Sequence, residues 1–142
     1  MTEFRPDCII NLHVEARGRP EKLAWACTIV HAKRGVLVAA RKFLGLFPRE
    51  TAETEALLFG LGQAARLLQE KVEVAATFPL DRMLTDNISG RRIPPGLKLK
   101  SEEIAKVWSG FRFKRITDLR GTEAEGLRED AEKAYERKRR RE

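Results

Sequence analysis

Apolar and polar residues alternate over the first third of the chain at the two-residue period of β-strands. In residues 8–16 this alternation puts His13 and Glu15 together on a polar face, with apolar residues on the other. Residues 23–31 and 36–45 are similar apolar runs, and short polar links separate the three segments. The pattern therefore predicts three successive strands that pair as an antiparallel meander.

The apolar spacing changes to the period of an α-helix between Thr51 and about Glu70. Thr51 is the predicted N-cap, with Thr54 as the alternative. The next apolar run, residues 72–77, predicts a short buried strand. Strand, long helix and strand form a right-handed crossover unit, so this strand is expected to lie parallel to its neighbour.

The second half of the chain alternates helical and strand patterns with a basic loop that contains prolines. We expect one domain over residues 1–135 and a basic C-terminal tail over residues 136–142. The remaining elements are predicted as a short helix at 79–88, a loop at 89–100, a helix capped by Ser101 and ending near Ser109, a strand at 111–119, and a final helix from about Glu123.

Composition narrows the class of protein. Lys and Arg number 28 against 21 Asp and Glu, and this net charge of +7 favours a polyanionic partner such as nucleic acid. Cys8 and Cys27 lie in apolar runs, so we interpret both as core residues. Trp25 is also assigned to the core, whereas Trp108 is left open between core packing and base stacking. No apolar stretch approaches the ~18 residues of a membrane span, so we expect no membrane association and a cytoplasmic location.

Three sets of short motifs follow one another along the chain: HVEARGRP with Ala24-Trp25-Ala26, then Ala52-Glu53 with Ala56 and Gly60-Leu61, and finally Ala124-Glu125-Gly126-Leu127. In this order and spacing they resemble the motifs of ribonuclease H type 1, over roughly residues 8–135. The resemblance implies an α/β ribonuclease-H-like fold. Its mixed five-stranded sheet has three antiparallel strands followed by parallel strands, and helices flank it.

The resemblance also implies a site for two divalent ions about 4 Å apart, held by converging carboxylates. The four carboxylate positions of the family correspond here to His13, Glu53, Thr77 and Glu125. Glu53 fits directly, and Glu125 keeps the charge with one extra methylene. Histidine and threonine are poor ligands for Mg²⁺, so we predict no metal binding, or weak binding through Glu53 and Glu125.

Two other acidic residues are candidate substitutes for the lost pair. Glu15 lies two residues beyond His13 on the same strand face, and Asp81 lies one helical turn beyond Thr77 if a helix begins there. Alternatively, His13 and Glu15 are ordinary polar strand residues, and Glu125 is an exposed acid in an acidic stretch.

Basic residues suited to phosphate contact occur in two regions, and their contribution to binding should fall steeply with salt. The loop at 89–100 carries Arg91, Arg92, Lys98 and Lys100, and the fifth strand is bordered by Arg112, Lys114 and Arg120.

Three functions remain open at this point. The first, which we favour, is a nucleic-acid-binding domain with weak or lost metal-dependent hydrolysis and no required cofactor, whose partner is an RNA–DNA hybrid or structured RNA. The second is an active, divergent ribonuclease H that uses Mg²⁺ or Mn²⁺ to cut RNA in hybrids. The third is a non-catalytic scaffold that reuses the fold and binds a protein partner.

Overall fold

The computed structural model describes residues 5–80 and 98–141. Long strands open the chain, and helices then alternate with short strands. The elements are β1 (Cys8–Arg17), β2 (Lys22–His31), β3 (Gly35–Gly45), α1 (Arg49–Arg66), β4 (Lys71–Ala76), α3 (Lys98–Gly110), β5 (Phe113–Asp118) and α4 (Gly121–Arg141).

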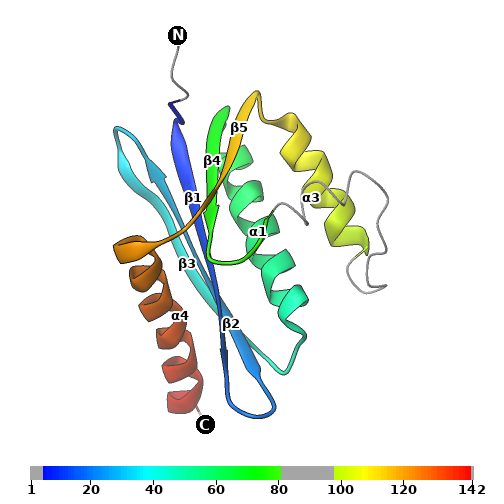
Figure 1. Cartoon of the computed structure of the whole chain (residues 1–142), viewed down its shortest axis with the longest axis vertical. Helices are drawn as coiled ribbons and strands as arrows, with labels where there is room; N and C mark the ends of the chain where they lie inside the picture. The colour runs from blue at the N-terminus through cyan, green and yellow to red at the C-terminus, as the bar shows by residue number, and fades with distance from the viewer. Residues whose placement is uncertain (1–4, 81–97, 142) are drawn as a thin grey trace.

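The strands form one sheet in the order β3-β2-β1-β4-β5 (Figure 1). β1, β2 and β3 pair antiparallel, whereas β4 pairs parallel to β1 and β5 pairs parallel to β4. This topology confirms the expected mixed sheet. The crossover through α1 carries the chain from the edge strand β3 to β4, beside the first strand.

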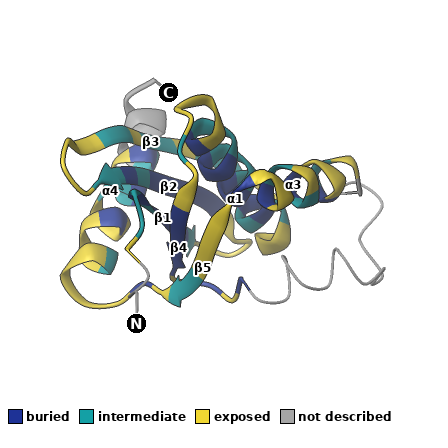
Figure 2. Cartoon of the chain, turned by 90° about the horizontal axis from the view of Figure 1, so that it is seen from above, coloured by how far each residue is buried: buried dark blue, intermediate teal, exposed yellow. Residues whose placement is uncertain are grey.

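Helices cover both faces of the sheet, with α1 and α3 on one face and α4 on the other (Figure 1). Along β1, Ile10 and Leu12 belong to the larger apolar core with α1, whereas Ile9 packs in the smaller cluster with Leu127 of α4. Figure 2 shows the buried residues concentrated on the central strands and the helix faces turned toward them. Because side chains alternate along a strand, His13 shares the α4 face with Ile9.

Gly60 lets α1 approach the sheet closely. A Cβ atom built on Gly60 would lie 2.7 Å from Ile10 Cγ2 and 3.2 Å from Leu12 Cδ2. Both neighbours are fully buried, so neither has room to move. This contact gives a physical reason for a glycine in the Gly60-Leu61 motif.

The hydroxyl of Tyr135 fixes α4 to the sheet. It lies 2.5 Å from the Lys22 carbonyl oxygen and 3.0 Å from the Glu15 carbonyl oxygen, both of which are acceptors. Burial is the main cause that raises the pKa of Tyr135 to about 12, so the phenol keeps its proton and donates. Its ring also packs edge-on against Phe43 of β3, at 5.2 Å between centroids. Tyr135 thus links α4 to the antiparallel half of the sheet.

The predicted ends of the long helix are wrong. α1 begins at Arg49 with Pro48 as N-cap, so Thr51 and Thr54 lie inside the helix. Pro48 has φ −61° and ψ 146°, an extended conformation that proline adopts readily before a helix. At the other end α1 stops at Arg66 rather than near Glu70.

Three later boundaries also differ from the prediction. α3 begins at Lys98, so Ser101 is a buried helical residue rather than an N-cap. β5 begins at Phe113 instead of residue 111, and α4 begins at Gly121, whose φ of 71° reverses the chain after β5. α4 continues to Arg141, so residues 136–141 of the predicted tail extend the helix. The predicted helix at 79–88 and most of the loop at 89–100 lie outside the described residues.

The core assignments are confirmed. Cys8 and Cys27 are free thiols at 1% and 0% exposure, and Trp25 is buried against Phe59. Trp108, left open by the sequence, is also buried in the larger core. Within residues 5–80 and 98–141, no helix has the length and apolarity needed to cross a membrane.

Candidate functional site

His13 and Thr77 meet where β4 ends beside the middle of β1. Leu12 is paired with Ala76, the last residue of β4, and the Thr77 amide donates a hydrogen bond to the Leu12 carbonyl oxygen at 3.1 Å. This register brings His13 Nδ1 to 2.7 Å from Thr77 Oγ1, within hydrogen-bond distance. The two residues that the sequence resemblance aligned with family aspartates are therefore in direct contact.

An acidic and a basic side chain extend this contact toward α4. His13 Nε2 lies 3.5 Å from Glu15 Oε2, and the same carboxylate oxygen lies 3.2 Å from Arg128 Nε of α4. We call Thr77, His13, Glu15 and Arg128 the His13 network. Glu132, one turn beyond Arg128, pairs with Arg128 at 3.6 Å and also with Arg17 of β1.

The His13 imidazole is mostly buried and favours its neutral form. Burial is the main cause that lowers the pKa of His13 below its usual 6.5, and the charges of Arg128 and Arg49 lower it further. Glu15 opposes them through its hydrogen bond and its charge. A neutral imidazole has one N–H donor and one acceptor nitrogen, so Nε2–H can donate to the Glu15 carboxylate while Nδ1 accepts from the Thr77 hydroxyl.

Glu53 lies near the start of α1, one turn after Arg49. Burial raises the pKa of Glu53 above its usual 4.5, Arg49 lowers it, and Glu50 raises it. The charge of Arg49 acts on both Glu53 and His13, so the first turns of α1 lie beside the His13 network. Glu125 lies exposed near the start of α4, beyond Ala124, which packs on the smaller cluster.

The donor groups at this site do not fit a pair of Mg²⁺ ions. Within residues 5–80 and 98–141, no three His, Cys, Asp or Glu side chains are grouped to hold a metal. His13 Nδ1 contacts a hydroxyl, Glu15 is paired with Arg128, and Arg49 adds positive charge beside Glu53. Mg²⁺ requires several oxygen ligands, preferably carboxylates, in near-octahedral geometry. Asp81, the predicted substitute, lies outside the described residues.

Among the described residues, Lys114 and Arg112 do not lie at the His13 network. Lys114 donates a hydrogen bond to the Trp108 carbonyl oxygen at 2.9 Å, and the Arg112 guanidinium lies 5.4 Å from the Phe113 ring centroid. Phe113 begins β5, and its pairing with Lys71 puts these residues at the opposite end of β4 from Thr77, roughly 20 Å away.

The other five predicted residues either pair with an acidic side chain or are not described. Arg120 lies beyond the end of β5 and forms an exposed pair with Asp118 at 3.2 Å. Lys100 of α3 pairs with Glu55 of α1 at 3.8 Å, so part of its charge is neutralised. Arg91, Arg92 and the Lys98 side chain lie outside the described residues.

Sequence reasoning missed Arg49 and Arg128, the two cations whose charges lower the pKa of His13. Arg49 precedes Glu53 by four residues, the spacing of neighbours on one helix face, and that signal was available. Arg128 follows Glu125 by three residues, but its partner Glu15 is on β1. Only the docking of α4 on the sheet brings them together.

Stability should fall as the pH drops through about 6.5, because of His13. The unfolded chain binds a proton near pH 6.5, whereas the folded chain resists it until the lower folded pKa is reached. Urea unfolding measures this effect. When the pH is lowered from about 7.5 to about 5.5, we expect the free energy of unfolding to decrease less in the His13→Asn variant than in the wild type. Glu53 acts in the opposite direction, since its raised pKa favours the folded state as it becomes protonated, but it is common to both proteins.

A matched variant identifies the responsible imidazole. The comparison is made in a His31→Asn background, which removes the only other histidine of the chain. Equal pH dependence in wild type and His13→Asn would contradict the assignment to His13.

Comparison with known proteins identifies the fold. No protein-family model matches the chain, and no curated protein matches it. Solved structures do match. The N-terminal ribonuclease H domain of a Mycobacterium tuberculosis protein is 22% identical, with a TM-score of 0.68 over 84% of this chain and 94% of that one.

Two further structures extend the comparison. The compost-derived LC11 ribonuclease H1, solved in complex with an RNA/DNA hybrid, is 23% identical, with a TM-score of 0.64 over 90% of this chain and 99% of that one. The prototype foamy virus protease–reverse transcriptase is 15% identical, with a TM-score of 0.73 over 96% of this chain and 21% of that one. At these identities the matches show that the chain has the ribonuclease-H-like fold.

Proposed function

We propose that this ribonuclease-H-like chain binds RNA–DNA hybrids and has weak or no metal-dependent hydrolysis. Two structural neighbours, LC11 ribonuclease H1 and the foamy viral protease–reverse transcriptase, were solved with RNA/DNA hybrids. The net charge of +7 supports a polyanionic ligand for the present chain.

The contact between His13 and Thr77 is the observation that carries this proposal. Two aspartates in contact at these positions would repel each other unless metal ions lay between them, whereas an imidazole and a hydroxyl form a hydrogen bond unaided. The chain therefore stabilises this part of the sheet without a metal.

Arginine side chains supply the positive charge that a nucleic-acid phosphate needs near this point. Arg49 approaches from α1 and Arg128 from α4, on either side of β1. A guanidinium presents several donors to phosphate oxygens and stays charged at all physiological pH values. We infer that a backbone phosphate of the hybrid binds between Arg49 and Arg128.

Fluorescence polarisation with a labelled hybrid in EDTA tests binding at several salt concentrations. We expect Arg49→Gln/Arg128→Gln to weaken binding and to reduce the slope of log K against log salt by about 0.9, the value for one phosphate contact. The matched control is Arg34→Gln/Arg66→Gln, which removes the same charge from the β2–β3 turn and the last turn of α1.

The binding proposal fails if both double variants weaken binding equally, because the effect would then be one of net charge alone. Duplex DNA, duplex RNA and single strands serve as competing probes. A preference for structured RNA over the hybrid would retain the site but change its ligand class.

The same hybrid tests hydrolysis in Mg²⁺ and in Mn²⁺. We expect no cleavage above the rate seen in EDTA. Robust turnover that Glu53→Gln abolishes would show instead that the chain is an active divergent ribonuclease H.

A further inference from the structure

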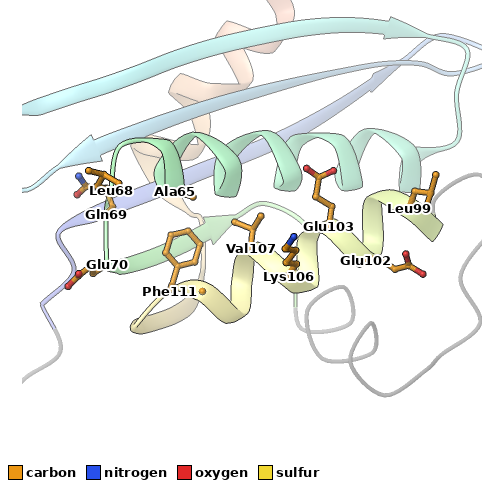
Figure 3. Close-up of a pocket in the computed structure, with 11 residues that line it drawn as sticks. Ala65, Leu68, Gln69, Glu70, Leu99, Glu102, Glu103, Lys106, Val107 and Phe111 are labelled. Carbon is orange, nitrogen blue, oxygen red and sulfur yellow. The ribbon is translucent and has the colours of Figure 1, made fainter.

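A groove of about 780 Å³ lies between the C-terminal end of α1 and α3, on the face of the sheet opposite α4. Figure 3 shows Leu68 at one end of the groove and Leu99 at the other, with Val107 and Phe111 between them. Leu68 is 86% exposed and Leu99 is 80% exposed. Two large apolar side chains at the ends of one groove form a surface suited to binding.

Leu68 also has a left-handed backbone conformation, which is unfavourable for leucine and does not contribute to folding stability. Its φ of 58° is left-handed, and it is the only positive-φ residue other than glycine in the described chain. Hydrogen bonds from the Leu68 amide to Ala65 and from the Gln69 amide to Ala64 form a Schellman motif, whose left-handed position is usually glycine. A leucine here costs backbone strain, and at 86% exposure its side chain gains little packing against the described residues.

Acidic residues surround this apolar surface, although the chain as a whole is strongly basic. Glu70, Glu102 and Glu103 line the groove against a single lysine, Lys106. Figure 3 shows Glu103 directed toward α1 across the groove. Such a surface repels nucleic-acid phosphates and attracts cationic side chains.

The groove is also separate from the His13 network. It lies on the α1 and α3 face of the sheet, whereas His13 and Arg128 lie on the α4 face. Only its Leu99 end approaches the first half of α1, where Lys100 pairs with Glu55 at 3.8 Å. A ligand in the groove therefore leaves the candidate phosphate site free.

We propose that this groove is a docking site for an amphipathic helical segment of a partner protein, with leucine-like side chains on one face and Lys or Arg beside them. The apolar side chains pack against Leu68 and Leu99, and the cations pair with Glu70, Glu102 and Glu103. α3 is 13 residues long, so a helix of about the same length, roughly 20 Å, matches the groove.

The test uses a fluorescein-labelled peptide of about 18 residues, designed as a helix with leucines at i, i+3, i+4 and i+7 and with lysines elsewhere. A second peptide keeps the leucines and has glutamates in place of the lysines. We expect the basic peptide to bind the wild-type chain at least about tenfold more tightly than the acidic one. Leu68→Gly and Leu99→Ser should each weaken its binding about tenfold or more.

Leu68→Gly also separates docking from folding. Because glycine suits the left-handed position, this variant should melt at a higher temperature than wild type while it binds the peptide less well. Leu46→Ser, at another exposed leucine, is the matched control and should leave peptide binding unchanged. Hybrid affinity should be the same in all these variants, so the result is independent of the proposed function.

Several outcomes would overturn the proposal. They are equal binding of the two peptides, no binding of either, or full binding by Leu68→Gly and Leu99→Ser. Concentration-dependent dimers of the wild type that Leu68→Gly abolishes would assign the groove to a second copy of the chain. Competition by a synthetic peptide of residues 81–97 would assign it to the chain itself.

Discussion

Replacing both His13 and Thr77 with aspartate is expected to give the chain a Mg²⁺ site that the wild type lacks. The 2.7 Å contact places the two side chains close enough for their new carboxylates to share an ion, and Glu53 lies on the adjoining start of α1. Without metal the variant should be less stable than wild type, because like charges would adjoin in a partly buried site. Bound Mg²⁺ removes that repulsion.

Thermal unfolding in a Mg²⁺ titration measures the effect. At a metal concentration about 100 times the dissociation constant, binding adds about 2.7 kcal/mol of stability, which is several degrees in melting temperature for a chain of this size. The wild type should show no such shift. The neutral double variant His13→Asn/Thr77→Asn is the matched control, because it changes both positions without adding charge.

A Mg²⁺ shift of the same size in wild type would contradict the interpretation that these two positions exclude the metal. So would an aspartate variant that folds but ignores Mg²⁺. The second result would indicate that Arg49 and Arg128 already neutralise the carboxylates, and adding Arg49→Gln/Arg128→Gln would then distinguish the two causes.

Adding one methyl group at Gly60 is expected to lower the free energy of unfolding by about 1–3 kcal/mol. The new Cβ would lie 2.7 Å from Ile10 Cγ2, closer than real Cβ contacts, and it is also hemmed in by Leu12 and Cys27. To relieve this overlap, α1 must move away from the sheet, which weakens packing along the whole helix. Urea unfolding of Gly60→Ala checks the result.

Gly62 is the matched control, two residues away in the same helix. A Cβ at Gly62 meets nothing within 4 Å, so Gly62→Ala should raise stability by up to about 1 kcal/mol through helix propensity alone. Opposite signs at the two positions are the expected signature. If Gly60→Ala also stabilises the protein, the result would contradict the close contact between α1 and β1 at Gly60.

The sequence predicted the sheet well because its signals are local and repeated. Alternation in residues 8–16 separated Ile10 and Leu12, which are buried under α1, from His13, which lies on the α4 face. The Gly60-Leu61 motif marked the closest contact between helix and sheet. Such features depend on periods of two or 3.6 residues, which a single segment already displays.

The helix ends were predicted less well, because competing capping signals lie close together. Thr51 is a good N-cap residue, yet Pro48 ends the extended segment three residues earlier. Ser101 is likewise a residue type that favours the N-cap position, but α3 begins three residues before it, and Ser101 is buried within the helix. At Leu68 the chain adopts a glycine-like conformation without a glycine, and no sequence rule predicts that.

The candidate site was predicted only in part, for a different reason. The family motifs identified His13 and Thr77 as corresponding positions, and the fold brings them into contact. Arg128 could not be assigned in this way, since its partner Glu15 is 113 residues earlier in the chain and meets it only when α4 docks. Pairings between distant elements require the topology before they can be recognised.

The two cations beside His13 belong to parts of the protein that are held with different strength. Arg49 begins a helix anchored in the larger core, whereas α4, which carries Arg128, is held by a seam of small side chains, mainly alanines, together with the Tyr135 hydrogen bonds. α4 is therefore the element expected to open first in local fluctuations. A phosphate that bridges Arg49 and Arg128 would link α4 to the more firmly packed α1. Bound nucleic acid should therefore slow amide hydrogen exchange along α4.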